Sequence, residues 1–374
     1  MEHDPMEDNY RASDGAELRA GSASLPDHVD PSSEVYLKPL GLRGGAALAW
    51  RALEVIVQCD GLVQRFTADD ASVLKWSERI GGAVQVRVPL RLNALQAPRA
   101  ELAGLQLDRP LIMGVLNVTP DSFSDAGDHA ETDVAIAAGR AMIDQGADIV
   151  DVGGESTRPR ATQPVEQDER ARALPVIKAL AGGGGTISVD TRRAAIMEDA
   201  LEAGAAIIND VSALTGDPQS MAVVAASTAP VILMHMQGTP ETMQDDPSYQ
   251  CAPLDIFDWL DGRIKACEAA GIARQRIIVD PGIGFGKTVD HNLSILRDLA
   301  VFHGLGCALA VGVSRKAFIG RLSGAAAPKE RLPGSLAAML HTVAQGTHIV
   351  RVHDVAETAQ ALAIQGALFP PDDV

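Results

Sequence analysis

The sequence predicts an α/β fold: an eight-stranded (β/α)8 TIM barrel that follows an acidic N-terminal tail and a small α+β extension. Eight short apolar runs recur after residue 109, and alanine-rich stretches of helical character separate them. Each run ends in glycine or polar residues, so unusual polar side chains gather at the carboxyl ends of the predicted strands. Barrels of this class place their sites at that end and occupy about 250 residues. A doubly wound sheet is disfavoured, because eight units is the number that a closed barrel needs.

Composition divides the chain into three parts. Residues 1–34 contain nine acidic residues, two arginines and few large aliphatic side chains, which predicts a disordered acidic tail. Residues 35–108 change in pattern and are expected to form the small extension. The barrel is expected over residues 109–374.

The extension mixes two periodicities. EVYLKPLGL (34–42) and AVQVRVPLRL (83–92) alternate like strands. VLKWSERI (73–80) has the pattern of a short amphipathic helix, and ALAWRALEVIV (47–57) is apolar enough for a helix or a strand. No chemical motif stands out in this part, which we expect to pack on the barrel.

The eight predicted strands of the barrel can be followed in order. Gly146 and Gly204 stand where the first and third helices should end, as expected for helix C-terminal glycines. The runs are LIMGVLNVT (111–119), ADIVDVGGEST (147–157), TISVDT (186–191), AAIINDVSA (205–213), PVILMHMQGT (230–239), RIIVDPGIGF (276–285), CALAVGVSRK (307–316) and HIVRVHDV (348–355).

Overall composition excludes several kinds of partner. The 374 residues carry a formal net charge of −17, which argues against nucleic acid and anionic membrane surfaces. No uncharged apolar run reaches about 18 residues, and the first ten residues are acidic where a signal peptide would be basic. The four cysteines form no C-x-x-C pair, which favours reduced thiols. We therefore expect a cytoplasmic protein that acts on small molecules.

Polar residues at the strand ends form the candidate site. A single Asp or Asn there is best explained as a helix N-cap. Four such residues that each follow an aliphatic run are hard to explain as four caps, and they should point into the barrel mouth: Asp151, Asp190, Asn209 and Asp280. Basic residues follow the second, seventh and eighth strands: Arg158, Arg315, Lys316, Arg351 and His353. The loops after the seventh and eighth strands are those that commonly hold phosphate in this fold. Carboxylates accept paired N–H donors, so the pattern favours a planar nitrogen heterocycle joined to a phosphate-like anion.

Two further features have simpler explanations than a second ligand. PGIGFGKT (281–288) resembles a phosphate-binding loop, but proline replaces its first glycine, which favours a tight loop with Lys287 near the site over ATP binding. His235 in LMHMQG either lies near the ligand or is a buried core histidine. Arg351 and His353 are two residues apart and should share one strand face.

Seven ordered motifs resemble the dihydropteroate synthase family of folate biosynthesis over roughly the last seven-tenths of the chain. They are MGVLNVTPDSFSD, DVGGESTRP, SVDT, INDVSA, VDPGIGFGKT, GVSRK and RVHDV. The resemblance implies a pterin-binding transferase that condenses 6-hydroxymethyl-7,8-dihydropterin diphosphate with 4-aminobenzoate, giving 7,8-dihydropteroate and diphosphate by an SN1-like route. It also implies a homodimer, Mg²⁺ and a sulfonamide target.

The resemblance assigns roles to individual residues. Pterin binding is expected from Asp190, Asn209, Asp280, Phe285 and Lys316. The aminobenzoate loops should contribute Phe123, Ser124, Thr157, Arg158 and Pro159. Diphosphate should contact Asn117, Arg351 and His353, with Asn117 also near the metal. The expected catalytic groups are Asp125, Asp190, Lys316, Arg351 and His353.

Two residues depart from the family pattern, and two other functions remain to be distinguished. Arg160 stands where relatives commonly have glycine, and Ala317 where some have serine, which bears on aminobenzoate and sulfonamide binding. One alternative is a pterin-binding methyltransferase barrel that passes a methyl group from methyltetrahydrofolate to a corrinoid. It needs neither the NVTPDSFSD loop nor the R-x-H pair, both of which are present. Another alternative is a non-catalytic pterin-binding paralogue, and loss of Asn117, Asp190, Lys316 or Arg351 would have favoured it.

Overall fold

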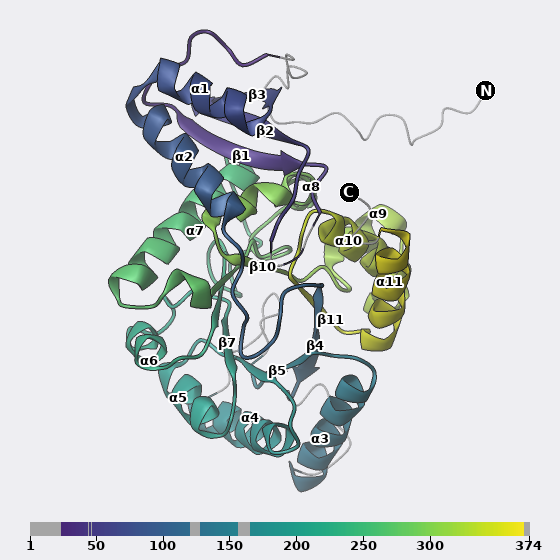
Figure 1. Cartoon of the computed structure of the whole chain (residues 1–374). Coiled ribbons are helices and arrows are strands. Elements are labelled where there is room, and N and C mark those ends of the chain that lie inside the picture. Colours follow the sequence, from purple (N-terminus) through teal and green to yellow (C-terminus); the bar gives the residue numbers. More distant parts are fainter. Residues whose placement is uncertain (1–23, 44, 46, 120–127, 156–164, 370–374) are drawn as a thin grey trace, which may run out of the picture.

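The computed structural model describes residues 24–43, 45, 47–119, 128–155 and 165–369, and the structural statements below concern this part of the chain. A small N-terminal layer lies on one side of a large barrel (Figure 1). Within the described helices, none is long and apolar enough to cross a membrane.

Eight parallel strands close into a barrel in the order β10-β11-β4-β5-β6-β7-β8-β9. This confirms the predicted fold class, and every predicted apolar run contains one strand. The strands are β4 (Leu111–Asn117), β5 (Ile149–Gly153), β6 (Ile187–Asp190), β7 (Ile207–Asp210), β8 (Val231–Met234), β9 (Ile277–Asp280), β10 (Ala308–Val311) and β11 (Ile349–Val352).

Helices surround the barrel. They are α3 (Asp128–Asp144), α4 (Glu166–Ala181), α5 (Ala194–Glu202), α6 (Ser220–Ala226), α7 (Ala252–Ala269), α8 (Val289–Arg297), α9 (Ala317–Ser323), α10 (Leu332–Ala344) and α11 (Val355–Leu368). Short 3-10 helices lie at η3 (Arg274–Arg276), η4 (Leu299–Leu305) and η5 (Pro328–Arg331). Gly146 and Gly204 follow α3 and α5 with φ of 104° and 105°, as the sequence predicted for helix ends.

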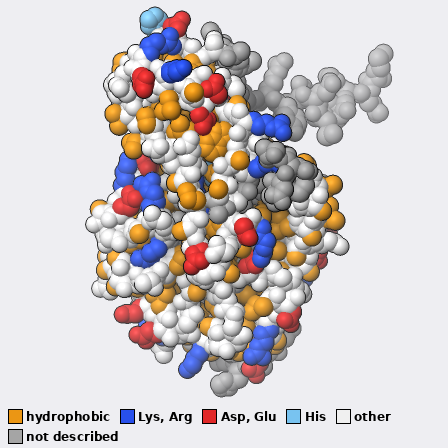
Figure 2. Space-filling view, viewed as in Figure 1, with side chains coloured by type: hydrophobic (Ala, Val, Ile, Leu, Met, Phe, Trp, Pro, Cys, Tyr) orange, Lys and Arg blue, Asp and Glu red, His pale blue; other side chains and the backbone are white. Residues whose placement is uncertain are grey.

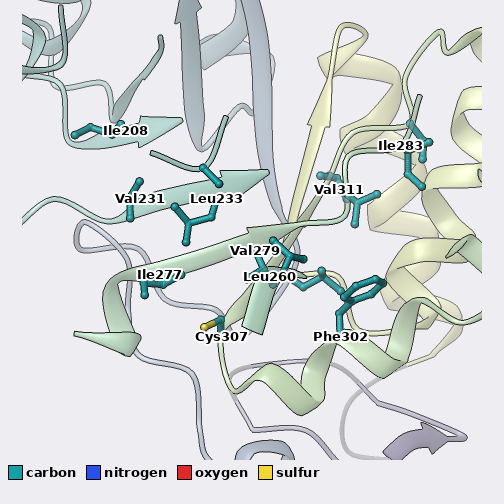
Figure 3. Close-up of a cluster of buried hydrophobic side chains, with 14 of the residues drawn as sticks. Ile208, Val231, Leu233, Leu260, Ile277, Val279, Ile283, Phe302, Cys307 and Val311 are labelled. Atoms are coloured by element: carbon teal, nitrogen blue, oxygen red, sulfur yellow. The ribbon is translucent and has the colours of Figure 1, made fainter. Parts of the chain in front are cut away.

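Small aliphatic side chains fill the space between the strands and the helices. Figure 3 shows Val231, Val279 and Leu260 among the buried residues where β8 and β9 meet α7. The strands are covered on both faces, which explains why they are continuous apolar runs rather than alternating ones. The wall is therefore rigid, and it fixes the side chains that leave its carboxyl end.

The N-terminal layer is an antiparallel sheet covered by two helices. Its strands are β1 (Glu34–Leu40), β2 (Ala52–Cys59) and β3 (Leu62–Ala68), with β2 in the middle, and its helices are α1 (Asp70–Ile80) and α2 (Gly82–Gln96). α1 and α2 cover one face, and residues from all five elements share a buried core. The other face contacts η4 and α7 (Figure 1). This layer is the α+β extension that the sequence predicted.

One predicted strand of the extension is wrong. AVQVRVPLRL lies in α2, where Val84, Val88 and Leu92 are buried while Val86 and Leu90 are about 60% exposed. Every second residue is apolar, so the segment is compatible both with a strand, whose period is two, and with a helix, in which residues four apart share a face. Packing against the sheet selects the helical stripe, and Pro89 is accommodated within it.

A buried charge cluster fastens the extension to the barrel. Asp298, which directly follows α8, accepts from Lys38 Nζ at 2.7 Å and from Arg65 Nη2 at 2.6 Å. Glu54 pairs with the same two cations. Burial opposes ionisation of Asp298, but the hydrogen bonds and charges of Arg65 and Lys38 outweigh it and lower its pKa.

We expect Asp298→Asn to lower the free energy of unfolding by about 3 kcal/mol at neutral pH, because Lys38 and Arg65 lose the more buried of their two carboxylate partners and keep only Glu54. A carboxyl whose pKa is lowered by folding stabilises the protein above its unfolded pKa of about 3.9 and stops doing so as the pH falls through the folded value. The difference from the parent should therefore shrink below about pH 4. Denaturant unfolding at pH 7 and pH 3.5 measures it. Exposed Asp246→Asn is the control, and equal effects of the two changes would contradict the account.

Candidate functional site

A cavity opens at the carboxyl ends of the barrel strands and encloses about 490 Å³ of empty space, open solvent included. Its lining combines polar groups with an apolar wall that includes Val115, Val211, Met234 and Ile283. The lining also contains six of the residues predicted from sequence: Asn209, Asp280, Phe285, Lys316, Arg351 and His353.

Arg351 joins two buried carboxylates at the edge of this cavity. Its Nε donates to Asp151 Oδ2, and its Nη2 donates to Asp190 Oδ2, both at 2.7 Å. Asn209 Nδ2 donates to the same Asp151 oxygen at 3.0 Å. Asp151 is fully buried and is not among the residues that line the cavity, so it orients Asn209 and Arg351 rather than facing a ligand. Asn209 and Asp280 line the cavity, as predicted, and Asp190 reaches its edge through Arg351. Asp151 was also predicted to point into the barrel mouth, but it does not line the cavity and positions Arg351 and Asn209 instead.

A neighbouring part of the lining, after β9 and β10, brings a cation, an aromatic ring and a carboxylate together. Lys316 Nζ lies 4.2 Å from the centre of the Phe285 ring. Asp280 is buried, and its Oδ1 accepts the backbone N–H of Gly282 at 2.7 Å, which leaves Oδ2 for another donor. A flat ring with N–H donors on its edge and a carbonyl facing Lys316 suits this arrangement.

His353 faces the cavity beside Arg351, as their two-residue spacing predicted. The Ser314 hydroxyl lies 3.1 Å from His353 Nδ1 and accepts the backbone N–H of His353 at 3.2 Å, so Ser314 fixes the ring. The sequence reasoning missed this serine, although it stands inside the GVSRK motif. Arg315 differs from the prediction: its guanidinium pairs with Asp354, and it is not among the residues that line the cavity.

The remaining predicted residues lie beside the cavity or outside the described residues. Asp190 and Asn117 flank Gly153, with Asp190 Oδ2 and Asn117 Oδ1 at 3.7 and 3.8 Å from the place where a glycine Cβ would stand. The predictions for Phe123, Ser124, Asp125, Thr157, Arg158, Pro159 and the departure at Arg160 fall outside the described residues. Ala317 begins α9 directly after Lys316.

Burial shifts the protonation of these groups in different directions. It lowers the pKa of Lys316 to about 8, although Asp280 opposes the change, and lowers the pKa of His353 to about 4, so the imidazole is neutral at pH 7. Burial raises the pKa of Asp190, and Arg351 opposes that rise. The pKa of Arg351 is raised, because its two carboxylate partners outweigh its own burial.

Comparison with known proteins decides the family. Residues 113–353 match the family model described as pterin binding enzyme. The chain is 45% identical over 266 residues to the dihydropteroate synthase of Escherichia coli (strain K12), covering 71% of this chain and 94% of that protein. The chain belongs to the dihydropteroate synthase family.

Solved dihydropteroate synthases have the same fold. The Xanthomonas albilineans enzyme with 4-aminobenzoic acid superposes with a TM-score of 0.69 at 43% identity, over 73% of this chain and 98% of that one. The Yersinia pestis enzyme in a sulfonamide drug complex gives 0.68 at 43% identity, over 72% and 98%. The family match begins at β4, so the extension precedes the part shared with the family.

Lys316 should make the pterin affinity of this chain depend on pH. An ammonium donates strongly to a carbonyl, and Lys316 loses its charge above its pKa of about 8. Affinity for 6-hydroxymethylpterin should therefore fall about tenfold between pH 7 and pH 9. Calorimetric titration across that range measures it. Lys316→Arg stays charged throughout this pH range, so any loss of affinity that persists in the variant comes from titration of the ligand itself. An equal loss of affinity in both proteins would contradict the role of Lys316.

Proposed function

We propose that the chain condenses 6-hydroxymethyl-7,8-dihydropterin diphosphate with 4-aminobenzoate to form 7,8-dihydropteroate and diphosphate. One observation carries this proposal: a single cavity holds a set of groups for a flat heterocycle and, beside it, the Arg351–His353 pair for an anion. Asn209, Asp280, Lys316 and Phe285 would hold the pterin. The family membership supports the same reaction.

The proposed chemistry breaks one bond and forms another. The C–O bond between the pterin methylene and the diphosphate breaks, and its electron pair leaves with the diphosphate oxygen. The amine lone pair then forms the C–N bond, and the nitrogen loses a proton. Arg351 stabilises the charge that grows on the leaving oxygen, while the buried carboxylates favour the positive charge that develops on the pterin, as an SN1-like route requires. Asp125 and the loop residues remain predicted participants.

Mg²⁺ is part of the proposal as an ion that the diphosphate brings with it. Among the described residues, no group of three or more His, Cys, Asp or Glu could hold a metal alone. The Asn117 amide oxygen beside Gly153 is a hard donor of the kind that Mg²⁺ accepts, with substrate phosphate oxygens and water completing its shell. When bound, such an ion would neutralise charge on the leaving diphosphate.

A second copy of this chain is the proposed partner. Large apolar side chains at the α9–α11 face are 59–69% exposed: Leu322, Ile364, Leu368 and Phe369. Orange side chains run along the edge of the molecule that α11 occupies (Figure 2). Such a face supports a homodimer, which sedimentation velocity tests.

A cytoplasmic location remains an inference from the sequence; the four free thiols suit a reducing compartment.

The proposed reaction is tested by diphosphate release from the dihydropterin diphosphate, with and without 4-aminobenzoate. Release that depends on the amine supports the synthase and distinguishes it from a methyltransferase, which uses no such substrate. Binding of the pterin with no amine-dependent release would instead favour the non-catalytic paralogue. Sensitivity to a sulfonamide that competes with 4-aminobenzoate is a further expectation.

A further inference from the structure

Lys287 is a buried cation that the proposed reaction does not use. It follows the glycine-rich loop after β9 and is only 3% exposed. Its Nζ lies 2.8 Å from the Phe285 carbonyl oxygen, 3.3 Å from the His235 carbonyl oxygen and 3.1 Å from His235 Nδ1. It is not among the residues that line the cavity, so it has no direct contact with a ligand there.

Three acceptors surround the Lys287 nitrogen, and this number matches the three donors of an ammonium group. The match requires His235 Nδ1 to accept, so His235 is neutral and carries its proton on Nε2. Burial and the neighbouring Lys287 lower the pKa of His235 to about 2, in agreement with a neutral ring. Burial also lowers the pKa of Lys287 well below its usual value; Asp280 favours the charged form, and Lys316 opposes it.

The loops that follow β8 and β9 touch each other through their backbones. A Cβ on Gly282, which has φ of 67°, would stand 2.0 Å from the His235 carbonyl oxygen, and a Cβ on Gly286 would stand 2.5 Å from the Gln237 carbonyl oxygen. Tyr249 donates its hydroxyl to the Gly286 carbonyl at 2.7 Å. Glycine allows this close approach, and Lys287 is the cation that joins the two loops where they meet.

The Phe285 carbonyl that Lys287 holds belongs to the residue whose ring walls the cavity. That ring lies 4.2 Å from Lys316 Nζ, so a shift of the Phe285 backbone would move both the wall and the Lys316 contact. Because of this connection, Lys287 is coupled to the Phe285–Lys316 wall of the cavity, which is the proposed pterin end.

We propose that Lys287 is a positioning residue for pterin recognition: it joins His235 to Phe285 and so holds the Phe285 ring and Lys316 in place. This inference rests on the proposed function, because it assigns the pterin to that wall. It also gives the lysine of PGIGFGKT a role other than phosphate binding: its side chain donates to backbone carbonyl oxygens rather than to a nucleotide.

The test uses Lys287→Met, which keeps the length of the side chain and removes its donors. The KM for the dihydropterin diphosphate should rise about tenfold or more, the size of a lost charged hydrogen bond, while the KM for 4-aminobenzoate stays the same. Exposed Lys178→Met is the control and should change neither. In a Phe285→Leu background the effect of Lys287→Met should largely disappear, because both changes act on one wall.

Several results would overturn the inference. A lower melting temperature with an unchanged KM would leave Lys287 a stabilising residue only, and equal rises in both KM values would remove the link to the pterin. If the variant does not fold, ¹⁵N NMR of the parent decides: a proton on His235 Nδ1 contradicts the three-acceptor arrangement. A parent that binds no pterin would overturn the proposed function and this inference together, whereas a parent that binds it equally well after Lys287→Met would overturn only the inference.

Discussion

Arg351→Met is expected to reduce the rate of dihydropteroate formation about 100-fold, because it removes the cation placed beside the leaving diphosphate. The same change leaves Asp151 and Asp190 without a cationic partner in a buried site. A buried carboxylate without its partner costs about 3–5 kcal/mol of stability, and Asp190 can relieve part of that cost by taking up a proton.

Steady-state rates and denaturant unfolding measure the two effects of Arg351→Met separately. Exposed Arg297→Met in α8 is the control and should change neither by much. A variant that folds with near-normal stability would show that the Asp151–Arg351–Asp190 arrangement contributes little. A variant that retains the parent's rate would remove Arg351 from the reaction.

Asp280→Asn is expected to weaken pterin binding about 100-fold. Asp280 is buried, and one of its oxygens is already committed to the Gly282 N–H, so the other is left to accept from the pterin edge. An amide in its place carries no charge and presents N–H donors to an edge that is itself rich in donors. Binding therefore loses a charged hydrogen bond, and it also leaves buried N–H groups without an acceptor.

Calorimetric titration with 6-hydroxymethylpterin measures the effect of Asp280→Asn. Asp290→Asn is a matched control, because Asp290 lies exposed nearby in α8. The KM for 4-aminobenzoate should change little, since Asp280 stands at the pterin end. Affinity within a factor of about two of the parent, far less than a charged hydrogen bond contributes, would rule out Asp280 as a pterin acceptor.

The barrel could be predicted from sequence because its strands are buried on both faces and therefore read as short uninterrupted apolar runs. The extension was harder, since AVQVRVPLRL satisfies a strand period and a helix spacing together. Only the packing of Val84, Val88 and Leu92 against the sheet decides between them. Local pattern therefore sufficed for the strands that are buried on both faces and failed for AVQVRVPLRL, where one face is exposed and two periods fit.

The membership of the site was easier to predict than its internal contacts. Strand ends converge in any such barrel, so the sequence alone places Asn209, Asp280 and Arg351 at one mouth. Which carboxylate Arg351 pairs with depends on side-chain reach across the barrel. Arg315 forms an ion pair with Asp354, and Lys287 contacts His235; both contacts also join residues that are distant in the chain. No sequence spacing encodes those contacts.

Formation of 7,8-dihydropteroate by the purified chain tests the central claim most directly. The chain is incubated with dihydropterin diphosphate, 4-aminobenzoate and Mg²⁺, and the product is identified by its mass. The account predicts product from the parent and about 100-fold less from Arg351→Met under the same conditions. A folded parent that binds the pterin and forms no product, or equal product from both proteins, would contradict it.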